Sequence, residues 1–116
     1  SWLDHCAASV LPDHELLLGE YASYGVPYTD SRIFLGAVVF LLTRFGDDPC
    51  RLLTGAISLG GDTDTVAAVV MGIALARGAE ESRIWELAEE IEDGPYGKKY
   101  LVSVGDALSE RYNLVN

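Results

Sequence analysis

The chain has 116 residues, of which 49% are hydrophobic, so it is long enough for one modest domain with a real core. Its 18 acidic and 8 basic residues give a formal net charge of −10, which argues against broad contacts with nucleic acid because phosphates would be repelled. The uncharged apolar stretch at residues 33–42 is about half of the roughly 20 residues that a membrane span requires. We therefore expect a single soluble domain over residues 1–116 that binds neither nucleic acid nor membranes.

The two cysteines, Cys6 and Cys50, are far apart in the chain and show no metal-ligand spacing. They are too few for a disulfide framework, so a reducing cytoplasm is the expected location. The residues after Ser1 contain no basic segment that leads into an apolar one, and a signal peptide is therefore not expected.

Proline and glycine divide the first half of the chain into helix-length segments. A short amphipathic helix is predicted over residues 13–23, with Asp13 as its N-cap. Apolar residues at helical spacing predict a second helix over about 31–45, capped by Asp30 or Ser31. Asp48 followed by Pro49 indicates the start of a third helix, which ends at the double glycine Gly60-Gly61.

The second half of the chain shows the same pattern. A small, apolar helix is predicted over 62–76, and Gly78 ends it. Ser82 is the expected cap of a further helix, whose apolar stripe reads as core and consists of Ile84, Trp85, Ala88 and Ile91. A last helix is expected over about 97–112. These segments together predict an all-α fold, a compact bundle of about five to six helices.

The hexapeptide at 60–65, Gly-Gly-Asp-Thr-Asp-Thr, places two acids and hydroxyl groups where a buried helix begins. In regular helix the side chains of Asp62 and Asp64 would point about 200° apart. With Asp62 outside the helix, the flexible glycines let its carboxylate turn toward Asp64, and Thr65 adds a neutral oxygen. Such a cluster suits Mg²⁺ or Mn²⁺. From the residues alone, simple capping of the helix by aspartate is an equally good interpretation.

Two other acidic motifs fit less well. A calcium-binding EF-hand loop would continue its alternating acids to a glycine and a distant glutamate, whereas here Val66 ends the pattern. An Asp-x-Asp phosphotransferase loop should follow an apolar strand, whereas here two glycines precede the acids.

Residues 60–79, Gly-Gly-Asp-Thr-Asp-Thr-Val-Ala-Ala-Val-Val-Met-Gly-Ile-Ala-Leu-Ala-Arg-Gly-Ala, resemble the C-terminal metal motif of the ADP-ribosylglycohydrolase family, which includes the dinitrogenase-reductase-activating glycohydrolases. The order of the preceding segments is also similar to that family. An aromatic-containing loop at 24–31 precedes an apolar helix, a short acidic connection at Asp47-Asp48, and a helix that leads into the motif.

The resemblance implies an all-α fold around a binuclear Mg²⁺ centre, in which Asp62, Asp64 and Thr65 are metal ligands. It also implies that the metals hold the ribose hydroxyls of ADP-ribose while a water molecule cleaves the glycosidic bond. The segment Gly25-Val26-Pro27-Tyr28 is similar to the substrate-lining loop of the family. Tyr28 and Gly61 are therefore the expected substrate-binding residues.

The resemblance covers nearly all of this chain but only the later portion of a family member. The remaining metal ligands of the family, a Thr-Asp-Asp motif, lie in an N-terminal half that this chain lacks, and no catalytic residue is assigned here. We expect an incomplete domain whose partners are ADP-ribose or ADP-ribosylated protein and, for completion, a second copy or a polypeptide carrying the N-terminal half. The alternative is a non-catalytic helical binding or assembly module that retains the packing of the family.

The histidines are not candidates for chemistry. His5 and His14 lie nine residues apart and have no acidic or cysteine partner in ligand spacing, so surface or packing roles are expected. Cys6 and Cys50 are expected to be inert thiols.

Overall fold

The structure is a computed structural model that describes residues 17–46 and 48–113. These residues form a short 3₁₀ turn, η2 (Gly19–Tyr21), followed by five α-helices and no strand longer than a single bridge. The prediction of an all-α chain is therefore confirmed. The described residues divide into two compact units, one up to Glu81 and one from Ser82 onward.

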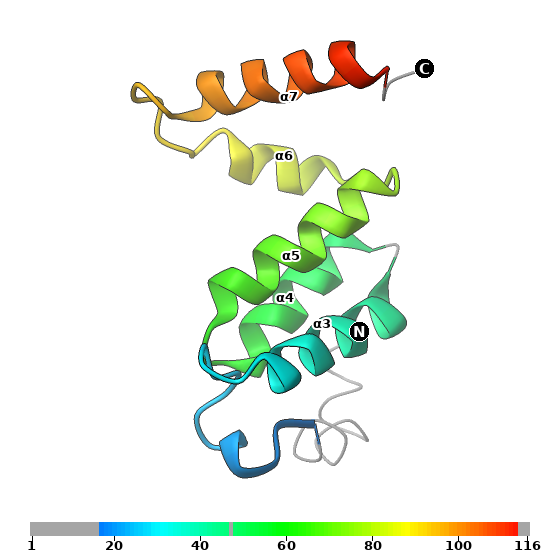
Figure 1. Cartoon of the computed structure of the whole chain (residues 1–116), viewed down its shortest axis with the longest axis vertical. Coiled ribbons are helices and arrows are strands. Elements are labelled where there is room, and N and C mark those ends of the chain that lie inside the picture. The colour runs from blue at the N-terminus through cyan, green and yellow to red at the C-terminus, as the bar shows by residue number, and fades with distance from the viewer. Residues whose placement is uncertain (1–16, 47, 114–116) are drawn as a thin grey trace. The chain divides into compact units, whose positions relative to one another are not determined.

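The first unit contains three helices, α3 (Ser31–Phe45), α4 (Pro49–Leu59) and α5 (Thr63–Ala76), and all three lie against one another (Figure 1). Their predicted bounds are confirmed almost to the residue. Asp62 occupies the N-cap position of α5, outside the helix, as the argument from the hexapeptide required.

Aspartate caps fix the starts of α3 and α4. The side chain of Asp30 accepts a hydrogen bond of 3.1 Å from the backbone N–H of Arg32, and Asp48 accepts one of 3.1 Å from the N–H of Arg51. Each carboxylate satisfies a donor that the first helical turn leaves without an intrahelical partner. Pro49 follows Asp48 inside the first turn, where its missing N–H costs nothing.

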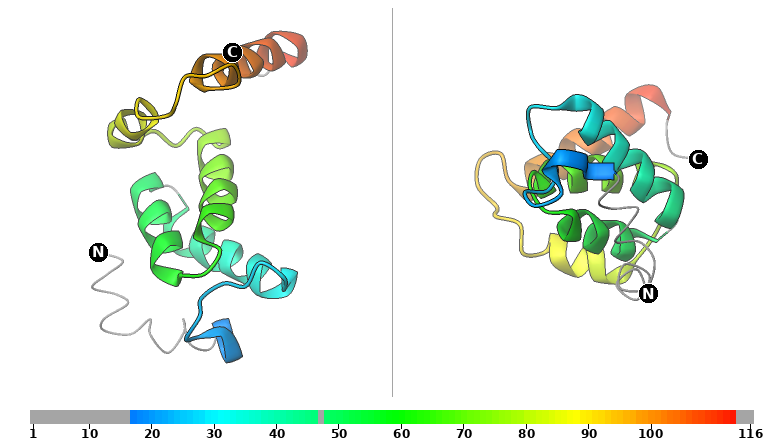
Figure 2. Two further views of the ribbon diagram at one scale, coloured as in Figure 1. Left: turned by 90° about the vertical axis from the view of Figure 1, so that its left-hand side faces the viewer. Right: turned by 90° about the horizontal axis from the view of Figure 1, so that it is seen from below.

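The core of this unit is apolar, and every helix contributes to it. The fully or nearly fully buried residues are Leu18, Val26, Ala37, Val38, Leu41, Phe45, Leu52, Ala56, Leu59, Val66, Val70 and Ala74. Small residues such as Ala56 and Ala74 allow the helices to approach closely. Figure 2 shows this arrangement from two further directions, with the segment before α3 running beside the junction of α4 and α5.

The second unit contains α6 (Ser82–Ala88) and α7 (Lys98–Tyr112). Neither helix has a buried residue. The prediction that Trp85 is a core residue is therefore wrong, since 61% of its surface is exposed. A stripe of apolar residues indicates that one face of a helix is suited to packing. A unit of only two helices is too small to bury such a face completely.

Two further expectations differ from the structure. Ser82 is the first residue of α6 rather than its cap, and the helix ends at Ala88, before Ile91 of the predicted stripe. Of the helix predicted over 13–23, residues 13–16 lie outside the described residues. Of the remainder, residues 17 and 18 are helical and Gly19–Tyr21 form the 3₁₀ turn η2. Gly19 has a φ of 54°, and this positive φ does not fit a regular α-helix.

Among residues 17–46 and 48–113, no helix has both the length and the apolar character needed to cross a membrane.

Candidate functional site

The start of α5 is joined to the loop at residues 24–29 by a short parallel bridge between Val26 and Gly61. The N–H of Val26 donates to the carbonyl of Gly60 at 3.0 Å, and the N–H of Asp62 donates to the carbonyl of Val26 at 2.8 Å. Val26 itself is buried in the core. Two segments about 35 residues apart in the sequence are therefore held side by side at the N-terminal end of α5.

Two glycines make this close approach possible. Gly25 and Gly61 have φ values of 85° and 72°, in the left-handed region that favours glycine. A Cβ atom at Gly25 would lie 2.1 Å from the carbonyl carbon of Gly60, and one at Gly61 would lie 2.2 Å from the carbonyl oxygen of Val26. The backbones on both sides of the bridge therefore require the absence of a side chain.

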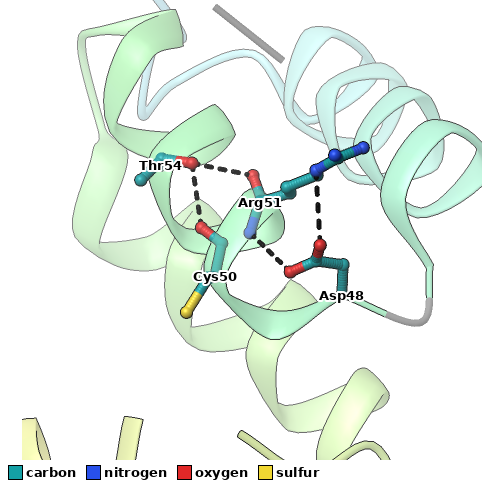
Figure 3. A network of polar contacts seen from close by, with 4 residues as sticks. All are labelled: Asp48, Cys50, Arg51 and Thr54. Atoms are coloured by element: carbon teal, nitrogen blue, oxygen red, sulfur yellow. Dashed lines mark hydrogen bonds and ion pairs between the residues drawn. The ribbon is translucent and has the colours of Figure 1, made fainter. Parts of the chain in front are cut away.

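Asp62 occupies an N-cap position, but its side chain makes no capping hydrogen bond. Its Oδ1 instead accepts a hydrogen bond of 2.8 Å from the hydroxyl of Thr65. Asp48 at the start of α4 provides the contrast, because Figure 3 shows its carboxylate bonded to the N–H of Arg51 in the usual capping manner. The capping interpretation, which the residues alone left open, therefore does not describe the side chain of Asp62.

Asp64 lies beside the same carboxyl group. A hydrogen bond between the side chains of Asp62 and Asp64, together with the N–H of Thr65, holds the pKa of Asp64 below its ordinary value. That N–H lies 3.0 Å from Oδ1 of Asp64. The two carboxyl groups thus meet, as the flexible backbone at Gly60-Gly61 led us to expect, and Asp64 retains its negative charge to lower pH than an ordinary aspartate.

An open pocket of about 460 Å³ lies where the loop meets the start of α5. One wall comes from Gly61, Asp62 and Asp64, and the other from Tyr21 and the loop residues 24–29. The predicted residues Tyr28, Gly61, Asp62 and Asp64 therefore line one pocket. Thr65 is not part of the lining, but its hydroxyl contacts Asp62.

The pocket also includes two aromatic residues that the sequence analysis did not select. Tyr21 is half-buried and Tyr24 is 80% exposed, and both line the pocket opposite the aspartates. Tyr28 is 87% exposed. The recurrence of tyrosine at 21, 24 and 28 could have indicated these two residues from the sequence. Three aromatic side chains close to a glycine turn offer surfaces on which a planar group stacks.

The donor atoms at this site fit a hard divalent cation. Two carboxyl groups and a hydroxyl are oxygen donors of the kind that Mg²⁺ and Mn²⁺ prefer. Within the described part of the chain, no group of three or more His, Cys, Asp or Glu residues is placed to hold a metal ion. Asp62 and Asp64, with the Thr65 hydroxyl beside them, therefore form a cluster of two carboxyl groups and one hydroxyl.

No family model matches this chain, and comparison with the curated proteins and with the solved structures gives no significant match.

Proposed function

We propose that this chain is the C-terminal part of a Mg²⁺-dependent hydrolase that resembles the ADP-ribosylglycohydrolases. It cleaves the glycosidic bond of ADP-ribosylated protein or of a related ADP-ribose conjugate. Asp62, Asp64 and Thr65 form one wall of the metal centre. The opposite wall comes from a second polypeptide or an N-terminal segment that carries the missing carboxylates.

The position of the Asp62 carboxylate is the observation that supports this proposal most strongly. Helix starts α3 and α4 use their aspartates to cap, whereas Asp62 leaves that role and lies with Thr65 and Asp64 at a pocket. Two carboxyl groups and a hydroxyl that lie close together supply oxygen donors of the kind that a hard cation prefers. A capping role alone gives no reason for this difference.

The residues of the chain have separate roles in this proposal. Asp64 supplies a carboxyl group, while Asp62 and Thr65 supply further oxygen donors. Tyr28 and Gly61 line the pocket and would contact the ligand. The metal, when bound, would act as a template and Lewis acid for the hydroxyl groups of the ribose.

A complementation experiment tests the proposal. The chain is mixed with a polypeptide that bears a Thr-Asp-Asp metal motif, and release of ADP-ribose from an ADP-ribosylated protein is measured with and without Mg²⁺. We expect Mg²⁺-dependent release that neither polypeptide gives alone and that Asp64→Asn abolishes. The absence of release in every combination would contradict the catalytic role.

A second candidate function is a non-catalytic assembly module, and the second unit favours it. On α7 the residues Leu101, Val104, Leu108 and Tyr112 share one face at spacings of three and four, and all of them are exposed. A face of this kind is covered in an obligate oligomer or by a partner chain. The module would form a stable oligomer with a melting temperature that does not depend on Mg²⁺, which distinguishes it from the hydrolase.

A further inference from the structure

An apolar groove lies within the second unit, where α6 and the residues that follow it meet the first turns of α7. It has a volume of about 380 Å³, and its apolar lining residues are Trp85, Ala88, Ile91, Leu101 and Val102. Apart from Ala88, each of these side chains is at least half exposed. Large apolar side chains that gather at one concave surface are typical of an interaction site rather than of scattered surface residues.

A second hollow continues this surface along the loop before α7. It has a volume of about 420 Å³ and shares Ile91 and Leu101 with the first. Tyr96 lines it and is 77% exposed, with its ring edge-on to Tyr100 at 5.2 Å between ring centres. The two hollows together, here called the α6–α7 groove, thus have Trp85 in one part and Tyr96 in the other. Exposed aromatic residues of this kind are enriched among the residues that dominate protein interfaces.

Negative charge accompanies the α6–α7 groove. Glu86 follows Trp85 in the chain, and Glu90 and Glu92 stand on either side of Ile91. All three glutamates are exposed, and Glu92 is itself a lining residue of the second hollow. The apolar side chains of the groove are therefore interspersed with carboxylates.

The lysines of the second unit do not neutralise these three glutamates. Lys98 is paired with Glu89, with 2.6 Å between its Nζ and a carboxylate oxygen, and Lys99 is paired with Asp93 at 3.1 Å. Within residues 17–46 and 48–113, none of the three glutamates forms an ion pair. Their negative charge is thus uncompensated by the described part of the chain.

This charge distinguishes between the possible occupants of the groove. A second copy of the chain would bring the same three glutamates and a net charge of −10, so like charges would face each other. Anionic lipids and nucleic acid are also negatively charged and would be repelled. A polypeptide segment with apolar residues on one face and lysine or arginine beside them matches both the apolar lining and the carboxylates.

We propose that the α6–α7 groove binds a basic amphipathic helix of another polypeptide. The apolar face of that helix enters the groove, where Trp85 is the main anchor, and its basic side chains pair with Glu86, Glu90 and Glu92. Docking of an amphipathic helix into an apolar groove is a recurrent mode of peptide recognition. This inference holds whether or not the chain is part of a hydrolase.

The test is a titration of the full chain with a synthetic amphipathic helical peptide of leucine and lysine, followed by backbone amide NMR shifts. One comparison peptide carries glutamate at every lysine position, and another has the same composition as the first with the helical pattern scrambled. We expect saturable shifts at residues 85–102 with the patterned lysine peptide alone. The affinity is expected to fall as the salt concentration rises, because exposed charge pairs are screened.

Two variants separate the apolar and the charged contributions. Trp85→Ala is expected to weaken the affinity about tenfold or more, because an aromatic anchor is lost. The Glu86→Gln, Glu92→Gln double variant is expected to weaken it about threefold or more and to reduce its salt dependence, because two exposed charge pairs are lost. Circular dichroism establishes that both variants remain helical, as expected for exposed positions.

The Glu20→Gln, Glu110→Gln double variant is the matched control. It removes the same charge from two exposed residues that do not line the groove. We expect it to bind the lysine peptide with unchanged affinity. An equal loss in this control would overturn the proposal, since general attraction to an acidic chain would then be responsible. Absence of saturation, or equally tight binding of the glutamate peptide, would also overturn it. Shifts at residues 85–102 that depend on protein concentration without peptide would do so too, because a second copy would then occupy the groove.

Discussion

The hydroxyl of Thr65 donates a hydrogen bond of 2.8 Å to the carboxylate of Asp62, although Asp62 stands where a capping side chain would bond the helix backbone instead. The two residues are three apart, and Asp64 between them contacts the same carboxyl group. The start of α5 is therefore organised around its side-chain oxygens.

Substitution of the cap residues separates a capping role from a ligand role. Asp48→Ala is expected to lower the free energy of unfolding by about 1 kcal/mol, because a true cap is lost. Asp62→Ala is expected to have a clearly smaller effect, since no capping bond exists there. Urea unfolding of both variants measures the difference. Equal losses would mean that Asp62 is an ordinary cap.

The glycines at the bridge are expected to be intolerant of any side chain. Gly25→Ala or Gly61→Ala forces a positive φ on alanine and a collision with backbone atoms, which is expected to destabilise the fold by about 1–3 kcal/mol or more. Gly72→Ala is the control, because it lies within α5 and a Cβ there meets open space. That variant is expected to be more stable by about 0.5–1 kcal/mol. Thermal or urea unfolding of the three variants decides the point, and a bridge variant as stable as the parent would contradict it.

The helices of the first unit could be predicted from the sequence, whereas the contacts between distant segments could not. The caps and bounds of α3, α4 and α5 depend on residues close in the chain. The bounds and the cap at Asp48 were predicted, and the cap of α3 was narrowed to Asp30 or Ser31. The bridge between Val26 and Gly61 joins two segments that are distant in the sequence and meet only in the folded chain. The hydrophobic periodicity of the sequence does not predict such a contact. Trp85 was mispredicted for a related reason. An apolar stripe indicates that a helix face can be buried, but it does not indicate which other element buries it.

The candidate site divides in the same way. That Asp62 would leave the helix and approach Asp64 followed from the flexibility of Gly60-Gly61. That Tyr21 and Tyr24 would line the pocket with Tyr28 did not follow, because their contribution depends on the turn that places them opposite the aspartates.

The cap of α3 is expected to depend on pH. Hydrogen bonding from the side chain of Arg32 and from the Arg32 backbone lowers the pKa of Asp30 below the ordinary 3.8. A carboxyl whose pKa is lower in the folded state stabilises the fold fully above its unfolded pKa, and that stabilisation is lost as pH falls through the folded pKa. Asp30→Asn lacks this titration. The difference in melting temperature between the parent and Asp30→Asn is therefore expected to be constant near neutral pH and to shrink below about pH 4. A difference that grows in acid would contradict this account.

The exposed face of α7 gives a prediction for the assembly module. If a second copy covers this face, Leu108→Glu is expected to convert an oligomer into a monomer, because a charge enters an apolar contact. Ser103→Glu is the control, since Ser103 lies on the opposite side of α7 at about 100° per residue. Sedimentation velocity measures both. An oligomer unaffected by Leu108→Glu, or a parent chain that is already monomeric, would exclude self-association through this face.

Binding of a cation by the acidic start of α5 is the central claim, and paramagnetic broadening by Mn²⁺ tests it most directly. Half of a metal site is expected to bind weakly, and substoichiometric Mn²⁺ reports weak binding through the loss of nearby amide NMR signals. We predict selective loss at residues 61–65 and at the bridged loop residues 25–28, reversal by excess Mg²⁺, and no selective loss in the Asp62→Asn, Asp64→Asn double variant. Uniform broadening along the chain, or the same selective loss in the double variant, would contradict the account.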